Sequence, residues 1–229
     1  MCGRFLFTSA IEAMRQLFKA STHLALSPRY NIAPTQDILV YSIQEEVGPC
    51  LLPMRWGLVP TWMKEMPRTA VFNARGETLQ EKPFFRGPYR HHRCLIPANG
   101  WYEWANLDGE KRPYAMASDN YAPLVFAGLC DVWSGPDGGS HLLSATIVTR
   151  PSVGHLDNVH ARMPLVLSEA GQKLWMNHAD FKPPNPLDPD LLDDLEKIAI
   201  KPANRDVGNV RNEGPQLLDP GDGFLGDLL

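Results

Sequence analysis

Cys2 has the most distinctive chemistry in this sequence, because it directly follows the initiator Met1. Removal of Met1 would leave a thiol and a free α-amine on one residue, two nucleophiles with reference pKa values of about 8.5 and about 7.7–8.0. With an aldehyde, such an amine forms a Schiff base, the thiolate attacks the imine carbon, and a five-membered thiazolidine closes. Position 2 therefore favours aldehyde chemistry, although a cysteine can also occur there incidentally.

Six short motifs between residues 1 and 164 follow one another in the order typical of the SOS-response-associated (SRAP) family. They are Met1-Cys2-Gly3-Arg4-Phe5, Tyr30-Asn31-Ile32-Ala33-Pro34, Arg55-Trp56-Gly57-Leu58-Val59-Pro60, Phe72-Asn73-Ala74-Arg75-Gly76-Glu77-Thr78, Gly100-Trp101-Tyr102-Glu103-Trp104 and His160-Ala161-Arg162-Met163-Pro164. Residues 207–210 also resemble the family's C-terminal block. Family members, first described as peptidases, trap abasic sites in single-stranded DNA covalently through the N-terminal cysteine, and the resemblance implies this activity here.

The resemblance implies roles for four catalytic residues. Cys2 would be the nucleophile that condenses with the ring-opened aldehyde of the abasic deoxyribose. His160, with a reference pKa near 6.5, would protonate the sugar oxygen. Glu103 lies among aromatic residues, where loss of solvent would raise its pKa and let it exchange protons with the amine and thiol. Asn73 offers an amide that orients the amine or a sugar hydroxyl without titrating.

Four further residues are candidates for DNA binding. Arg4 is two residues from the nucleophile and could place a phosphate against it. Arg75 would share a face with Asn73 if that segment is extended, and would also bind phosphate. Arg162 belongs to the same motif as His160. Trp62 resembles the position that stacks on bases beside the lesion, although core packing is an equal alternative for this side chain.

The charge of the chain is unevenly distributed. The formal net charge is −4, which gives no general attraction to nucleic acid. Residues 55–93, however, contain eight Lys or Arg against three Glu, a net of +5, interleaved with aromatic residues. Such a segment can bind a phosphate backbone and stack bases, or it can form a solvated rim. Within it, no single phosphate contact is assigned to Arg68, Arg86, Arg90 or Arg93.

Apolar periodicity predicts the elements that must position these residues. Short runs rich in Val, Ile, Leu and Trp predict strands at 38–43, 50–59, 124–133 and 141–149, and the glycine-rich turn at 135–139 predicts a hairpin. Helices are predicted at 8–20, where Ser9 and Glu12 have capping-box spacing, and at 168–177 and 190–200. We expect one α+β domain over residues 1–229, with a flexible tail from about 215. The resemblance adds a mainly antiparallel, barrel-like β core.

Several features are expected to be absent. The four cysteines form no Cys-x-x-Cys pair, and no metal or other cofactor is expected. The sequence shows no signal peptide and no apolar stretch of membrane-spanning length. We expect a cytoplasmic monomer that joins the nucleoid at damage and whose partner is single-stranded DNA containing abasic sites.

Two other functions fit the same residues. The first is an N-terminal-nucleophile cysteine peptidase or amidase, possibly self-cleaving, in which Cys2 attacks a carbonyl, its amine or His160 serves as base, and Asn73 stabilises the oxyanion. The second is a non-catalytic reader of single strands that uses the basic segment and its tryptophans. A retained Met1 would leave only the second.

Overall fold

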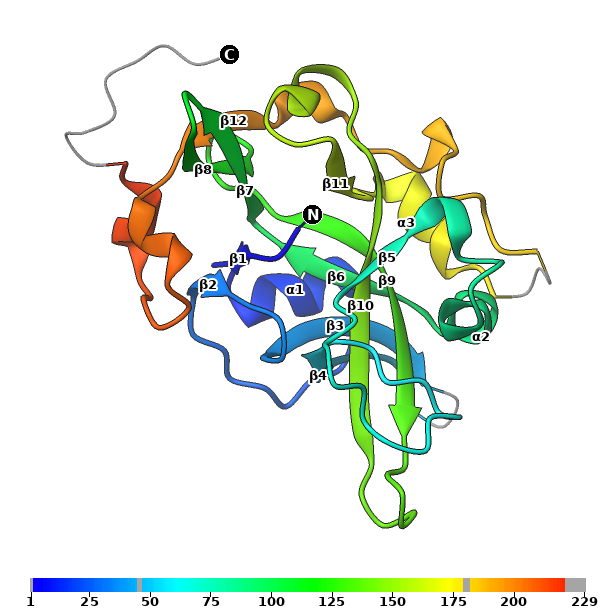
Figure 1. The fold of residues 1–229 in the computed structure, drawn as a ribbon. Coiled ribbons are helices and arrows are strands. Elements are labelled where there is room, and N and C mark those ends of the chain that lie inside the picture. Colours follow the sequence, from blue (N-terminus) through cyan, green and yellow to red (C-terminus); the bar gives the residue numbers. More distant parts are fainter. Residues whose placement is uncertain (1, 45–46, 179–181, 221–229) are drawn as a thin grey trace.

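The computed structural model describes residues 2–44, 47–178 and 182–220, and its centre is a closed β-barrel (Figure 1). The barrel strands, in their order around it, are β10 (Leu142–Pro151), β4 (Gly48–Trp56), β3 (Asp37–Gln44), β6 (Arg93–Ala98) and β9 (Leu124–Trp133). Strand β9 pairs again with β10, which closes the ring. Among these pairings only β10–β4 is parallel. The prediction of an α+β fold with a mainly antiparallel barrel-like core is confirmed.

A second sheet holds the N-terminal segment. Its strands, in order, are β12 (Ala199–Pro202), β8 (Glu110–Ala117), β7 (Gly100–Leu107), β1 (Phe5–Phe7) and β2 (Arg29–Ile32). Strand β1 lies between β7 and β2 and is antiparallel to both. The Phe5 ring meets Trp56 edge to face, with centroids 5.1 Å apart, and also contacts Phe126. These aromatic contacts anchor the N-terminal strand to the barrel core.

Two three-residue strands flank one end of β10. Strand β5 (Asn73–Arg75) pairs with β10 in parallel, and β11 (Arg162–Pro164) pairs with it in antiparallel orientation. Thr149 of β10 is the partner of both Arg75 and Pro164. The asparagine and histidine motifs are therefore brought to the same end of β10 (Figure 1).

The part of the chain that the structure describes contains three α-helices, α1 (Ile11–Phe18), α2 (Pro83–His91) and α3 (Glu169–Met176). The helices predicted at 8–20 and 168–177 are confirmed as α1 and α3. The capping box at the start of α1 is wrong, because Ala10 is the N-cap and no side chain caps the helix. The Ser9 hydroxyl instead lies 2.8 Å from the Asn99 amide nitrogen, from which it accepts a hydrogen bond.

The four predicted strands are confirmed as β3, β4, β9 and β10, and the 135–139 turn joins β9 and β10 as an antiparallel hairpin. The helix predicted at 190–200 is wrong. Two 3₁₀ turns, η3 (Pro189–Leu191) and η4 (Leu195–Lys197), occupy this region before β12. The Asp188 and Asp194 carboxylates accept hydrogen bonds from the backbone N–H groups two residues further along the chain, and such local bonds compete with a continuous helix.

The tail predicted to be flexible from about residue 215 is partly ordered. Pro215–Leu218 form η6 and Leu217 is buried, whereas residues 221–229 lie outside the described residues.

Arg93 does not belong to the basic surface expected over residues 55–93. Its side chain is 1% exposed and cannot contribute to a surface patch. Its guanidinium donates to the backbone oxygens of Tyr89 (2.9 Å) and Arg90 (3.1 Å) in the last turn of α2. It also donates to Trp175 (2.6 Å) in α3 and to Asn177 just after it. A cation at these positions satisfies helix-end carbonyls that would otherwise lack partners. Arg93 therefore joins the ends of two helices.

Arg93→Ala is expected to lower the free energy of unfolding by about 3 kcal/mol, because buried carbonyls lose charge-assisted hydrogen bonds. Urea denaturation followed by circular dichroism measures this loss. Arg90→Ala is the matched control, since the Arg90 side chain is exposed and its removal should change stability by less than about 0.5 kcal/mol. Equal stabilities of the two variants would contradict the structural role of Arg93.

Candidate active site

Cys2 lies three residues before the start of β1, and its side chain is fully buried in the chain that still carries Met1. The Asn73 side-chain amide donates a hydrogen bond of 2.7 Å to the Cys2 backbone oxygen. The Asn73 Oδ1 atom is buried and accepts no hydrogen bond from the described residues. Strand β5 is extended, as predicted, so Asn73 and Arg75 share a face. The asparagine motif thus holds the backbone of the candidate nucleophile and leaves a buried acceptor beside it.

Glu103 lies on β7, the strand that pairs with β1. The Tyr102 N–H donates a hydrogen bond of 2.9 Å to the Arg4 oxygen, which holds the N-terminal segment against the part of β7 that carries Glu103. The Glu103 side chain is only 3% exposed. Burial raises the pKa of this carboxyl to about 7. Burial also raises the pKa of the Cys2 thiol, and the nearby Glu103 charge raises it further. The two groups are therefore electrostatically coupled.

The His160 ring is oriented by the backbone of β11. The Arg162 N–H donates to His160 Nδ1 at 2.9 Å, which places the proton of the neutral ring on Nε2. When protonated, Nδ1 can instead donate to the Arg162 oxygen, 3.1 Å away. Burial lowers the pKa of His160 below its ordinary 6.5. The ring is therefore mainly neutral at pH 7.

Arg162 is held by Glu77, which follows β5, and by Thr149 of β10. Its guanidinium makes an ion pair with both carboxylate oxygens of Glu77, with Nη2–Oε2 at 3.0 Å. Nη2 also donates to the backbone oxygen and the hydroxyl of Thr149, each at 3.0 Å. The hydrogen bond from Arg162 lowers the pKa of Glu77. The sequence analysis assigns no role to Glu77. The only hint in the sequence is that Glu77 belongs to the same motif as Asn73 and Arg75.

Arg4 and Arg75 differ in their environments. The Arg4 guanidinium donates to the backbone oxygens of Val207 (2.9 Å) and Gly208 (3.3 Å) and to the Asn31 side chain. This residue therefore ties the N-terminal segment to the C-terminal block. Arg75 is exposed at the end of β5. Of these two predicted phosphate ligands, Arg75 has the more accessible side chain.

Trp62 does not lie in the core, because its side chain is 59% exposed. It follows β4, and its ring meets Phe84 of α2 edge to face, with centroids 6.2 Å apart. Phe84 in turn contacts Phe85. Trp62 is therefore the exposed member of an aromatic group whose two phenylalanines are half-buried. The contacts that join Cys2, Asn73 and Glu103 are separate from this group.

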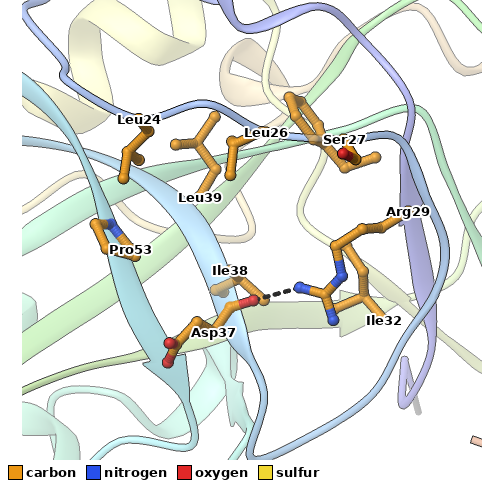
Figure 2. Close-up of a pocket in the computed structure, with 10 residues that line it drawn as sticks. Leu24, Leu26, Ser27, Arg29, Ile32, Asp37, Ile38, Leu39 and Pro53 are labelled. Carbon is orange, nitrogen blue, oxygen red and sulfur yellow. Dashed lines mark hydrogen bonds between the residues drawn. The ribbon is translucent and has the colours of Figure 1, made fainter.

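Two hollows in the described part of the chain are lined by none of the predicted site residues. A cavity of about 230 Å³ lies between the 24–29 segment and strands β3 and β4, with mainly apolar walls (Figure 2). Arg29 lies on its wall and donates to the Asp37 backbone oxygen. A larger groove of about 960 Å³ is lined by His91, His92 and His178 together with both apolar and polar side chains.

Residues 2–44, 47–178 and 182–220 contain no group of three or more His, Cys, Asp or Glu arranged to hold a metal ion. Within the same ranges, no helix has the length and apolar character needed to cross a membrane.

Comparison with known proteins identifies related sequences. The profile of the family described as SOS response associated peptidase (SRAP) matches residues 1–210. The abasic site processing protein YoqW of Bacillus subtilis is 35% identical over 233 residues, which cover 96% of this chain and 99% of YoqW. The abasic site processing protein HMCES of Mus musculus is 33% identical over 234 residues, covering 85% of this chain and 65% of HMCES.

The fold also has a close structural relative. A crystal structure of a protein from Bacteroides thetaiotaomicron superposes with a TM-score of 0.83. The superposition covers 95% of this chain and 99% of that one, at 21% sequence identity. At this level of identity, the comparison supports the fold.

Proposed function

The chain belongs to the SOS response associated peptidase (SRAP) family, and from that premise we propose that it processes abasic sites in single-stranded DNA by forming a thiazolidine crosslink through Cys2. The relatives named as abasic site processing proteins support the abasic site as the substrate, and the residues around Cys2 support the crosslinking chemistry. The crosslink would shield the strand from cleavage. Because the reaction consumes both the amine and the thiol, each molecule acts once unless the crosslink is reversed.

The reaction proceeds without oxidation or reduction. After removal of Met1, the Cys2 amine adds to the ring-opened sugar aldehyde, and loss of one water gives the imine. The thiol then adds across the C=N bond, its sulfur bonding to carbon and its proton passing to nitrogen. His160, in the protonated form that is the minor one at pH 7, would give a proton to the sugar oxygen during ring opening. Glu103 would take a proton from the amine and return it to the departing hydroxyl.

The observation that carries this proposal is the state of the Glu103 carboxyl. It is buried beside the Cys2 segment, and its pKa is raised to about 7. A group with this pKa is present in both protonation states near neutral pH, as a proton shuttle requires. The buried Asn73 Oδ1 adds an acceptor for an amine N–H or a sugar hydroxyl.

The DNA strand would approach through cationic and aromatic groups. Arg75 is exposed on the strand that carries Asn73, and Arg162 begins the strand that follows His160. Charge-assisted contacts from these side chains to phosphates would place the sugar against Cys2. Arg4 holds the N-terminal segment that carries Cys2 in place through its hydrogen bonds to the backbone oxygens of residues 207 and 208.

The proposal is tested by mixing Met1-processed protein with a single-stranded oligonucleotide that contains one abasic site and running a denaturing gel. A shifted protein–DNA band is expected. The matched control is the same oligonucleotide with its abasic aldehyde reduced to the alcohol, which should give no band. A peptide substrate tests the peptidase alternative, for which an acyl-enzyme would form and abasic DNA would have no effect. Absence of the shifted band with the aldehyde-bearing strand would contradict the proposal.

Trp62→Ala is expected to weaken non-covalent binding of intact single-stranded DNA by about 5- to 150-fold, the effect of losing one stacked base. Fluorescence anisotropy at fixed salt measures the dissociation constant. Because Trp62 is exposed, thermal stability should hardly change. Leu174→Ala, which removes an exposed apolar side chain from α3, is the control and should bind DNA as the wild type does. Unchanged affinity of the Trp62 variant would show that this side chain does not contact DNA.

A further inference from the structure

Glu77 and Arg162 form a two-pronged ion pair in a partly shielded position. The two carboxylate oxygens accept from Nη1 and Nη2 of the guanidinium. The side chains are 31% and 14% exposed, respectively. Bidentate geometry and partial removal from solvent make such a pair stronger and more directional than an exposed one. The pair can therefore fix the relative position of the segments that carry it.

Each partner of this ion pair belongs to a different half of the candidate site. Glu77 lies in η1 (Gly76–Thr78), which directly follows β5, and β5 carries the Asn73 amide that binds the Cys2 backbone. Arg162 starts β11, and its backbone N–H donates to His160 Nδ1. The ion pair thus links the strand that holds Cys2 to the residue that orients His160.

The His160 backbone is tied to β10 by separate bonds. The Ser152 hydroxyl donates to the His160 oxygen at 2.6 Å, and the Ser152 N–H donates to the Ala161 oxygen at 3.0 Å. These bonds fix the loop relative to the end of β10. The Glu77–Arg162 pair adds a direct tie from this loop to β5 and η1, across the end of β10 where Thr149 also binds Arg162.

We propose that Glu77 is a positioning residue for the crosslinking reaction, which acts through Arg162 to hold the His160 ring in its Nε2–H form at a fixed separation from Cys2. This inference rests on the proposed function. Glu77 itself touches neither the sugar nor Cys2. Its carboxylate also neutralises the Arg162 guanidinium. Glu77 should therefore raise the rate of the reaction but lower the affinity for DNA.

Glu77→Gln tests this role, because the amide keeps the shape of the side chain and loses its charge. At saturating abasic DNA, the first-order rate of crosslinking is expected to fall about 10- to 100-fold, as small displacements of a catalytic group do. The DNA concentration that gives half the maximal rate should stay unchanged or fall, because Arg162 keeps its charge without a neutralising partner. Glu81→Gln, the same change at an exposed site after η1, should alter neither quantity.

A second measurement needs no DNA. The ¹⁵N spectrum of the His160 ring, assigned by comparison with His160→Gln, should show the Nε2–H tautomer in the wild type and a mixture of tautomers in Glu77→Gln. If no chain crosslinks DNA but this ring signal changes, the proposed function fails, whereas the effect of Glu77 on the His160 ring stands. The two proposals are therefore separable.

A wild-type crosslinking rate in Glu77→Gln would overturn the inference. So would weaker DNA binding with an unchanged maximal rate, because Glu77 would then serve only to place Arg162 on a phosphate. If Glu77→Gln does not fold, Glu77→Asp keeps the charge on a shorter side chain. A reduced rate with unchanged half-saturation in that variant supports the positioning role, and a wild-type rate refutes it.

Discussion

Replacing Cys2 with Ala is expected to abolish the stable protein–DNA crosslink completely. The Ala variant keeps a free α-amine after Met1 is removed, so it can still form a Schiff base with the abasic aldehyde. It lacks the thiol that closes the thiazolidine ring, and an open imine hydrolyses in water. A denaturing gel should therefore show no shifted band, whereas addition of borohydride during the reaction should trap the imine and restore one.

The control for this experiment is Cys50→Ala, which removes a buried thiol from β4. This variant should crosslink as the wild type does. A crosslink of wild-type yield from the Cys2 variant without borohydride would assign the chemistry to another nucleophile. Retention of Met1, checked by mass spectrometry of the intact protein, should have the same effect as loss of the thiol.

Glu103→Gln is expected to slow crosslinking by about 10²- to 10⁴-fold, the usual contribution of a positioned proton-transfer group. The pH dependence should change as well. In the wild type, the rate should fall as the pH drops below about 7, because Glu103 becomes protonated and no longer accepts a proton from the amine. The Gln variant should lose the part of this fall that Glu103 causes and keep the part caused by protonation of the Cys2 amine, whose reference pKa is about 7.7–8.0. Single-turnover rates between pH 5 and 9 measure both effects.

The same substitution is expected to stabilise the fold at neutral and alkaline pH. Because folding raises the pKa of Glu103 from 4.5 to about 7, the cost of ionising it is absent below pH 4.5, grows between these values and is complete above pH 7. This cost is about 3 kcal/mol. Urea unfolding at pH 8 should therefore show Glu103→Gln to be more stable than the wild type, with little difference at pH 4.

The control is Glu196→Gln, at an exposed carboxylate in η4. It should change neither the crosslinking rate nor the stability at pH 8. A Glu103 variant that keeps both the wild-type rate and its acid-side fall would show that another group moves the proton.

The elements that sequence patterns predict well are those with long, locally determined signals. Strands β9 and β10 are ten residues long, rich in apolar residues and joined by a glycine-rich turn, and the sequence predicts both nearly to their bounds. Strands β5 and β11 have three residues each, too few for any periodicity. Both form strands because they pair with β10. Helix α2 begins at Pro83 and contains Pro88, a residue that ordinarily argues against a helix.

The same distinction applies to the candidate site. Motif resemblance predicted roles for Cys2, Asn73, Glu103 and His160, and those roles stay predictions. The partners of the arginines could not be inferred, because they come from distant segments. Arg4 bonds to Val207, 203 residues away, and Arg162 pairs with Glu77, 85 residues away. Only the closure of the barrel and its second sheet brings such residues together.

The buried N-terminal segment also bears on when the protein can mature. Cys2 is fully enclosed, and the strand that follows it is hydrogen-bonded on both edges. An aminopeptidase has to bind the backbone on both sides of the bond that it cleaves, so the buried Cys2 would hinder removal of Met1 once the chain has folded. Competence for covalent capture would then be decided on the ribosome, in the interval before β7 is synthesised and pairs with β1.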